Sequence, residues 1–280
     1  MICLTGDVHH ASLGTGNQRA SALSEVQVAR RYLALLADAG VKATFFVSGR
    51  AFLEEWAELE PLCAHPLVEI GGHNFNCFKL AAPHRLWKKI AGSYNGPAWI
   101  QRRDALRTIR IIEERTGRRP ILWRNHMYMH GPHTERVLAA CGIRLCSDGV
   151  RARGTGPEWH RAGLYNFPLN VIPDHEHIYH AERTPAWVER WVRRYHWSDD
   201  FGPGSYPVEQ WTDIVLDNLR RNEERGAVSN MLIHPITLHL ADGFKSFARI
   251  LDFLARHETV HMSEVLASPA GGRARAQAHA

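Results

Sequence analysis

The chain has 280 residues, enough for one large domain with a substantial core or for two small ones. With 45% hydrophobic and 22% charged residues, its composition excludes disordered and collagen-like proteins, and no apolar run is long enough to cross a bilayer. The formal net charge of +5 comes from arginines spread along helices and from Arg273 and Arg275 near the end of the chain. Because the basic motifs and the stacking motifs of nucleic-acid-binding proteins are absent, we expect no nucleic-acid partner. The positive charge is compatible with an acidic substrate and with peripheral contact with a membrane, and it does not decide between them.

The cysteines and the first residues indicate a cellular compartment. The five cysteines are an odd number without a Cys-x-x-Cys pair, which favours free thiols over a disulfide framework. The N-terminal apolar segment meets Asp7 almost at once and lacks the basic and long apolar stretches of a secretory signal. We therefore expect a cytoplasmic protein without a transmembrane segment.

Apolar segments alternate with helical patterns along most of the chain. Strands are expected at residues 1–5, 43–47, 67–70, 121–123, 143–146 and 228–233, with an extended, proline-containing stretch at 166–172. Helices are expected at residues 25–39, 51–63, 107–115, 134–140, 187–195, 211–225 and 244–256. The first of these helices has a capping box beginning at Ser24 and a terminating Gly40. The third strand is expected to stop at the Gly71-Gly72 pair.

This alternation predicts an α/β fold with parallel strands. So many strand–helix units in one domain exceed an ordinary open sheet, so we expect a distorted (β/α) barrel of about seven strands. Residues 1–266 would form this single catalytic barrel. Residues 267–280 are rich in Ala, Gly, Arg and Gln without apolar periodicity, and we expect a disordered C-terminal tail there.

Titratable residues follow the predicted strands where the apolar runs stop. They are Asp7, His73, Arg124, Asp148 and His234. Any one of them alone is more simply a cap, a turn or a surface residue. The carboxyl ends of parallel strands converge on one face, however, where active sites of such folds are built. Five such coincidences favour a functional site.

The order and context of these residues resemble the polysaccharide deacetylases of carbohydrate esterase family four. The resemblance rests on Leu-Thr-Gly-Asp at residues 4–7, Ile-Gly-Gly-His-Asn-Phe-Asn-Cys at 70–77, Trp-Arg-Asn-His-Met-Tyr at 123–128, Cys-Ser-Asp at 146–148 and Leu-Ile-His-Pro at 232–235. It extends from residue 1 to about residue 266. Within the superfamily, the opening Thr-Gly-Asp-Val-His-His is most similar to WbmS-type deacetylases of O-antigen biosynthesis.

The resemblance implies a divalent metal that activates water against the acetamide of an N-acetylated sugar. It implies that Asp7 is the base, Arg124 the residue that orients it and His234 the general acid, with His73 as the first metal histidine. Amide hydrolysis needs these residue types, because a weak electrophile requires a Lewis acid, a base for the water proton and an acid for the leaving amine.

Two positions depart from the family pattern. Val8 replaces the usual metal-binding carboxylate after the base, so His9 and His10 are the nearest candidate ligands, and only one should serve because they alternate in direction. Cys77 stands where the second metal histidine is usual. If Cys77 is a ligand, its thiolate would favour zinc, and the alternative is that it is simply a buried apolar residue.

Further residues are candidates for contact with substrate. These are His126, Tyr128, Asp148 and His175. His175 and His177 lie in a proline-flanked segment that we expect at the barrel rim, whereas the Trp187, Trp191, Tyr195 and Trp197 series favours helix packing over sugar binding.

The sequence thus predicts a metal-dependent sugar N-deacetylase of surface-polysaccharide or O-antigen biosynthesis. Its acetamido-sugar substrate could be nucleotide-linked, lipid-linked or polymeric. Two alternatives stay open. The first is a catalytically silent carbohydrate-binding barrel, and the second is a metal amidohydrolase acting on a small non-sugar amide.

Overall fold

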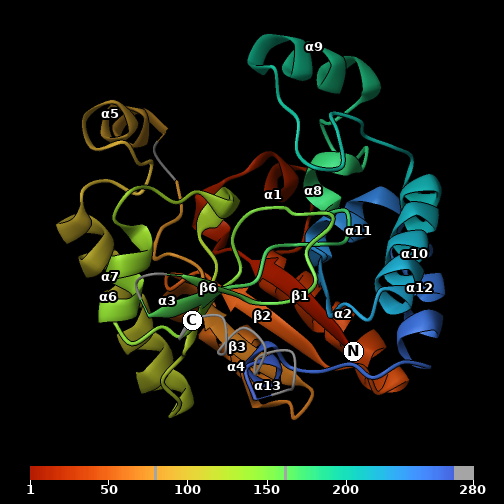
Figure 1. Cartoon of the computed structure of the whole chain (residues 1–280), viewed down its shortest axis with the longest axis horizontal. Coiled ribbons are helices and arrows are strands. Elements are labelled where there is room, and N and C mark those ends of the chain that lie inside the picture. Colours follow the sequence, from red (N-terminus) through yellow and green to blue (C-terminus); the bar gives the residue numbers. More distant parts are fainter. Residues whose placement is uncertain (79–80, 161–162, 268–280) are drawn as a thin grey trace.

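The computed structural model describes residues 1–78, 81–160 and 163–267, and these contain one eight-stranded sheet (Figure 1). Its strands are β1 (Ile2–Val8), β2 (Ala43–Val47), β3 (Val68–Gly72), β4 (Leu122–Trp123), β5 (Leu145–Cys146), β6 (Glu158–His160), β7 (Leu164–Asn166) and β8 (Ser229–Leu232). The strand order is β6-β7-β5-β4-β3-β2-β1-β8, with every pair parallel except β6 and β7. The predicted α/β fold with parallel strands is confirmed.

The backbone ladder of the sheet ends at β6 and at β8, and two buried asparagines link β8 to the stretch that follows β7. The Asn170 backbone N–H donates to the Asn230 carbonyl at 3.2 Å, and the Asn230 N–H donates to Asn170 Oδ1 at 2.8 Å. The Asn230 side-chain amide donates to the Phe167 carbonyl at 2.7 Å. The extended stretch after β7 therefore curls towards β8, giving the distorted barrel that the sequence predicts.

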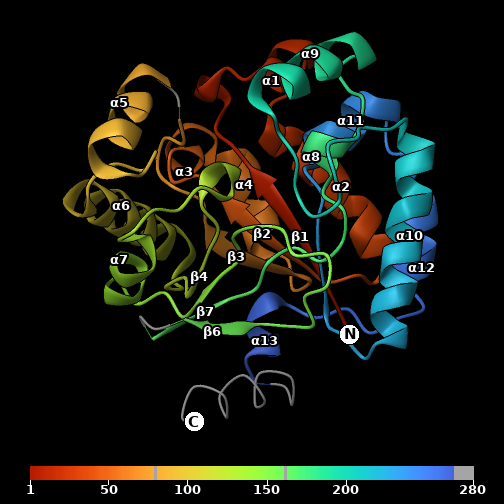
Figure 2. The ribbon, with the colours of Figure 1, turned by 45° about the horizontal axis from the view of Figure 1, so that its top comes forward.

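Helices surround this sheet (Figure 2). They are η1 (Ala11–Leu13), α1 (Gly16–Ala20), α2 (Glu25–Ala39), α3 (Ala51–Glu54), α4 (Trp56–Ala64), α5 (Ala81–Ala91), α6 (Ala98–Thr116), η2 (His126–Tyr128), α7 (Thr134–Ala140), α8 (Asp174–His177), α9 (Pro185–Tyr195), α10 (Val208–Glu224), α11 (Pro235–Asp242), α12 (Phe247–Leu254) and α13 (Met262–Val265). Among the described residues, no helix combines the length and apolarity needed to span a bilayer.

Helix α2 shows how local sequence sets these elements. Ser24 Oγ accepts from the Gln27 N–H while the Gln27 side chain accepts from the Ser24 N–H, and Gly40 ends the helix in the left-handed conformation. The Tyr32 and Leu36 side chains are fully buried against the sheet. The helix predicted from the capping box is confirmed.

The structure corrects the expected end of the third strand. β3 continues through both glycines. Glycine is needed at these positions because neighbouring rings leave no room for a side chain. A Cβ at Gly71 would lie 2.6 Å from the Phe46 ring, and one at Gly72 would lie 2.5 Å from the Trp123 ring. Glycine here permits close packing instead of ending the strand.

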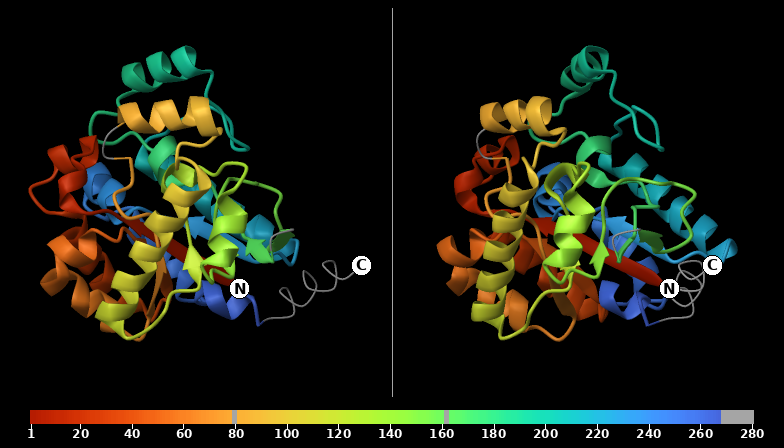
Figure 3. Two further views of the ribbon diagram at one scale, coloured as in Figure 1. Left: turned by 90° about the vertical axis from the view of Figure 1, so that its left-hand side faces the viewer. Right: turned by 60° about the vertical axis from the view of Figure 1, so that its left-hand side comes forward.

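Other differences concern segments without a clear pattern. The expected helix 51–63 is broken at Glu55, and helices α5 and α11 and strand β6 were not expected. Residues 268–280 of the expected disordered tail lie outside the described residues. Helices α5 and α9 both project at the end of the barrel where the parallel strands finish (Figure 3). The elements that frame a site at this end are thus α5, α9 and the loops after each strand.

Candidate active site

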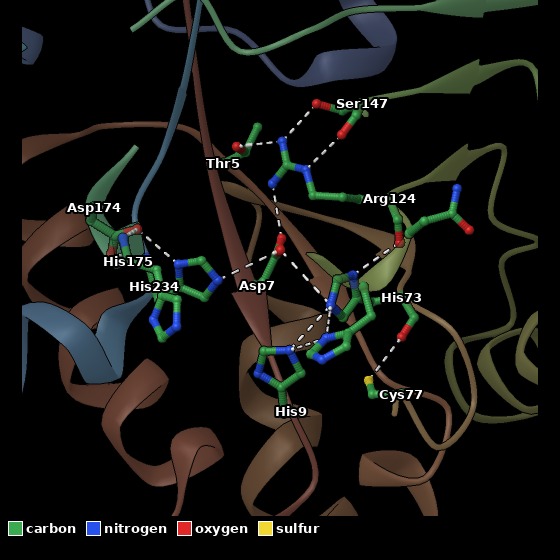
Figure 4. Close-up of polar contacts among 12 residues, drawn as sticks. Thr5, Asp7, His9, His73, Cys77, Arg124, Ser147, Asp174, His175 and His234 are labelled. Atoms are coloured by element: carbon green, nitrogen blue, oxygen red, sulfur yellow. Dashed lines mark hydrogen bonds and ion pairs between the residues drawn. The ribbon is translucent and has the colours of Figure 1, made fainter. Parts of the chain in front are cut away.

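A buried carboxylate and a buried guanidinium form the centre of the site (Figure 4). Arg124 Nη1 donates to Asp7 Oδ1 at 2.8 Å, and neither side chain is more than 2% exposed. Arg124 is held by Thr5 Oγ1 and by the Ser147 hydroxyl and carbonyl, at 3.0, 2.6 and 2.9 Å. Burial alone would raise the pKa of Asp7, but nearby positive charge, chiefly that of Arg124, lowers it to about 2. Asp7 is therefore an anion whose second oxygen is left for other partners.

His234 lies on the other side of that second oxygen. Its Nε2 is 3.7 Å from Asp7 Oδ2, and its Nδ1 donates to Asp174 Oδ1 at 2.8 Å. Asp174 also accepts from the His234 backbone N–H at 2.6 Å, which fixes the direction of the ring. Burial opposes protonation, but Asp174 and then Asp7 outweigh it and raise the pKa of His234 to about 9. The pair therefore combines an ionised carboxylate with a protonated imidazole near neutral pH.

Three further histidines converge beside Asp7. His9 Nε2 lies 3.1 Å from His73 Nε2 and 3.1 Å from His126 Nδ1, and the last two atoms are 3.3 Å apart. His73 Nε2 is also 3.8 Å from Asp7 Oδ2. Residues from β1 and from the loops after β1, β3 and β4 are thus brought to one point.

The opposite ring atoms fix the direction of two of these rings. His9 Nδ1 donates to Glu25 Oε2 at 2.8 Å and His73 Nδ1 donates to the Arg124 carbonyl at 2.9 Å, so the Nε2 atom of each ring points into the cluster. Burial lowers the pKa of His73 to about 3 and that of His126 far below its usual range. Imidazole rings oriented from behind by a carboxylate or a carbonyl are the arrangement found around protein-bound metals.

The spacing of these nitrogens provides a test of fit for a metal. Imidazole nitrogens 2.0–2.1 Å from one tetrahedral ion would be about 3.3 Å apart, close to the separations in the cluster. The cluster of His9, His73 and His126 therefore has the ligand type and spacing that fit a divalent ion.

The side chains of Cys77 and His10, the other two candidate ligands, make their contacts away from the three imidazoles. Cys77 Sγ belongs to the same group of ligand atoms, all within 4.8 Å of one another, but its thiol donates to the His73 carbonyl at 3.5 Å. Burial, reinforced by nearby carboxylates, raises the pKa of that thiol well above its usual range. The His10 ring contacts Ser48 Oγ at 2.9 Å, on the face of the segment away from His9. Of the two candidates His9 and His10, only His9 reaches the cluster.

Strained backbone delivers several of these side chains. Asn74 and Cys77 have positive φ values of 53° and 52°, as do Met127 and Tyr128 at 56° and 53°. The two loops are tied together because Asn74 Oδ1 accepts from the His126 N–H at 2.9 Å. Such conformations persist only where surrounding contacts enforce them, and they are enriched at functional sites.

Asp148 has a supporting position. It accepts from the Asn125 backbone N–H at 2.8 Å and from the Asn125 amide at 2.6 Å. It does not belong to the described residues that line the cavity next to Asp7. Asp148 thus braces the loop that carries His126 and Tyr128.

A cavity of about 300 Å³ opens onto these groups. His126, Tyr128 and His175 line it, together with Asp7, His9, His73 and His234. The opposite wall comes from α9 and the residues before it, and includes Glu176, Arg183, Trp187 and Trp191. The two indole rings are stacked 5.9 Å apart, and the Arg183 guanidinium lies 4.9 and 5.2 Å from them.

Several of these residues were missed by the sequence analysis. Glu25 and Asp174 had no signal beyond being acidic residues near helix starts. The Trp187 and Trp191 spacing was visible, but helical spacing alone does not distinguish a packed face from a cavity wall.

Comparison with known proteins supports a family. A family model described as polysaccharide deacetylase matches residues 20–146. A candidate polysaccharide deacetylase from Mycobacterium smegmatis is 17% identical with a TM-score of 0.69, covering 99% of this chain and 91% of that one. No curated protein matches the chain.

Two other solved structures share the fold. PuuE allantoinase is 15% identical with a TM-score of 0.61, covering 93% of this chain and 86% of that one. A candidate polysaccharide deacetylase from Pseudomonas aeruginosa PAO1 is 16% identical with a TM-score of 0.59, covering 93% and 87%. The polysaccharide deacetylase model thus matches a little under half of the chain, and the three solved structures share its fold.

Proposed function

We propose that this protein is a metal-dependent N-deacetylase that hydrolyses the acetamide of an N-acetylated sugar. The observation that carries the proposal is the arrangement around Asp7 Oδ2, which faces a protonated His234 on one side and the imidazole cluster on the other. A base, an acid and a cluster suited to a metal thus share one cavity.

The proton transfers follow from this geometry. Asp7 Oδ2 takes a proton from water as the water oxygen bonds to the acetamide carbon, while Arg124 holds Asp7 Oδ1 and keeps the carboxylate in place. His234 Nε2 then gives its proton to the nitrogen as the C–N bond breaks. Asp174 stabilises the imidazolium before transfer and fixes its direction. The products are acetate and a free amino sugar.

We assign the metal to His9, His73 and His126, with Glu25 orienting His9. When bound, the ion supplies a Lewis acid for the acetamide oxygen and for water. Three imidazoles with nitrogens 3.1–3.3 Å apart support zinc over magnesium or calcium, which prefer oxygen ligands. Cys77 then remains a thiol that holds the backbone of His73.

The wall opposite the cluster supports a sugar as substrate. Indole faces stack against the apolar face of a pyranose ring, and Trp187 and Trp191 line the same cavity as the acid and base. Substrate contact by His126, Tyr128 and His175 is consistent with their places in the cavity. A role in surface-polysaccharide or O-antigen biosynthesis is supported by the resemblance of residues 5–10 to WbmS-type deacetylases.

One observation favours a second candidate, a metal amidohydrolase acting on a small non-sugar amide. A structurally similar protein is named as an allantoinase. The aromatic wall argues for the sugar, because a small ureide offers no extended ring face to two indoles. The test therefore uses acetamido sugars and allantoin side by side.

The deciding experiment measures acetate release by wild type and by Asp7→Asn. The variant keeps the bulk of the side chain but removes the base, so turnover should fall on the order of a hundredfold or more while metal content stays within error. Asp200→Asn, at an exposed position, is the matched control and should resemble wild type.

Three results would contradict the proposal. Equal acetate release by wild type and Asp7→Asn would remove Asp7 as the base. Release of product from allantoin alone would favour the non-sugar amidohydrolase. Sugar binding without acetate release from any acetamido sugar by metal-loaded wild type would identify a silent carbohydrate-binding barrel.

A further inference from the structure

Helix α5 presents a mixed basic and apolar surface. Arg85, Lys88 and Lys89 are exposed on it, and the helix contains no acidic residue. Leu86 and Ile90, one turn apart on one face, are 52% and 69% exposed. No described carboxylate forms an ion pair with any of the three cations. Two large aliphatic side chains therefore stand in solvent among unpaired positive charges.

Helix α9 has the same character on the other side of the cavity. Arg190, Arg193 and Arg194 are exposed, and among the described residues only Arg193 has an ion-pair partner, Glu189. Tyr195 at the end of the helix is 57% exposed. Aromatic residues with a polar end are favoured at the boundary between water and lipid.

Charge counting shows how far the basic residues are concentrated. Helix α5 has three cations and no acid, and α9 has three cations and one acid. Their combined surplus of five equals the formal net charge of the whole chain, +5, so the remaining residues together are neutral. The two helices are separated by almost a hundred residues in the chain, so the fold brings their charges to one end of the molecule.

The two helices lie at the same end of the molecule, beyond the carboxyl ends of the strands (Figures 1 and 3). The cavity that contains Asp7 opens at this end, with Trp187 and Trp191 of α9 in its wall. Met127 also lines that cavity and is 53% exposed. We call the six cations of α5 and α9, together with Leu86, Ile90 and Tyr195, the basic rim.

We propose that the basic rim docks the protein on an anionic lipid surface, with the cavity facing the membrane. Cations near such a surface are attracted by its negative potential, and apolar side chains among them can enter the headgroup region. A nucleic acid would satisfy the charges equally well, but it would leave the aliphatic pair of α5 in water. The exposed Leu86 and Ile90 therefore favour the lipid.

This orientation specifies the substrate, a step that rests on the proposed deacetylase function. A cavity held against a bilayer receives a sugar whose carrier is anchored in that bilayer. The acetamido sugar would then be linked to a lipid, and not carried by a freely diffusing nucleotide. The reaction that supplies it must attach an N-acetylated sugar to a membrane-embedded lipid.

The test measures co-sedimentation of the full chain with vesicles. Neutral phosphatidylcholine vesicles are compared with vesicles containing about 30% phosphatidylglycerol, at low and high salt. We expect binding to the anionic vesicles only, weakened by salt. The triple variant Arg85→Glu, Lys88→Glu and Lys89→Glu should lower the partition coefficient at least about tenfold, because each cation contributes separately to attraction.

Two further variants separate lipid binding from general charge effects. Leu86→Ser with Ile90→Ser leaves the charge unchanged and should lower binding about tenfold or more, since both side chains lose their apolar contact. The matched control Arg31→Glu, Arg118→Glu and Arg256→Glu makes the same charge change at exposed positions outside the basic rim and should bind nearly as wild type.

The outcomes are distinguishable from those for deacetylation. Absence of wild-type binding to anionic vesicles, equal losses in both triple variants, or unchanged binding of the Leu86 and Ile90 variant would each overturn the docking proposal. Binding to single-stranded or duplex DNA in place of vesicles would do the same.

A second arm uses the same acetamido sugar in soluble form and on an alkyl anchor in anionic vesicles. The α5 triple variant should keep turnover of the soluble sugar and lose turnover of the anchored one about tenfold. Equal turnover of both by wild type and variant would overturn the lipid-linked assignment. Loss of all turnover in wild type would instead count against the proposed function.

Discussion

His234 is the residue whose charge sets the working pH of the proposed reaction. Its pKa of about 9 means that the imidazolium needed for proton donation is present below that pH and lost above it. The stabilisation from its charged form is complete below its ordinary value of 6.5 and disappears as pH rises through about 9. The alkaline side of the rate profile should therefore fall near pH 9.

Asp174→Asn tests this assignment. The amide can still contact the ring but no longer offers a negative charge, so the alkaline limb should move down by about one pH unit or more. The measurement is the dependence of kcat/KM on pH for both proteins. An unmoved limb would show that another group donates the proton, with His175 the nearest candidate in the cavity.

The ligand assignment can be tested by metal content. His9→Ala and His126→Ala should each reduce bound metal in the purified protein by about tenfold or more, while Cys77→Ser and His10→Ala retain it. The cobalt-substituted wild type should lack a thiolate charge-transfer band, because Cys77 stays protonated. Such a band, or loss of metal in Cys77→Ser, would make the thiol a ligand.

The sequence brought Asp7, His73, Arg124 and His234 to attention because each follows an apolar strand, and the structure does place these side chains together. His126 was considered for substrate contact and as an alternative acid, and not as a metal ligand. Its place in the imidazole cluster depends on the positive φ of the following Met127 and on the Asn74 contact, neither of which leaves a periodic signal.

At the scale of elements, α9 determines what the cavity can accept. Trp187→Ala and Trp191→Ala should each raise KM for an acetamido sugar about threefold to tenfold with little change in kcat, because the lost stacking lies away from the reacting atoms. Steady-state kinetics with a soluble sugar provide the measurement. Glu189→Gln on the same helix, at an exposed position outside the described cavity lining, is the control and should leave KM unchanged.

An opposite result would be informative. A fall in kcat at constant KM would mean that α9 positions the acid or the base and does not bind the sugar ring. The sequence could not decide this point, since an amphipathic helix packed on the barrel and one standing over a cavity have the same periodicity.

At the scale of the whole molecule, the asparagine bridge between β7 and β8 should govern stability. Asn230→Ala removes an amide that donates to Ser147 Oγ and to the Phe167 and Pro168 carbonyls, and it leaves these buried acceptors without that donor. We expect a loss of about 1–3 kcal/mol in the free energy of unfolding. Denaturant titration measures it, and an unchanged midpoint would show that the barrel does not depend on this closure.

The parallel strands were predictable because buried β-branched and aromatic runs alternate with helical patterns, whereas the antiparallel β6 was not expected. The contact of the stretch after β7 with β8 was not predictable either, because it depends on the side-chain amides of Asn170 and Asn230. The glycines of β3 were misjudged for a related reason. Their role is defined by the rings of Phe46 and Trp123 on neighbouring strands, not by their own sequence context.

The segment that carries α9 starts and ends at residues that are neighbours in the structure. Ile178 pairs with Tyr206 in a parallel bridge, and the Tyr179 N–H donates to the Tyr206 carbonyl at 2.9 Å. Residues 179–205 therefore form a cassette whose two ends are already neighbours, as in sites that tolerate domain insertion. The proposed acid and base lie outside it. Exchange of this cassette between related barrels would therefore transfer substrate specificity and leave the hydrolytic centre intact.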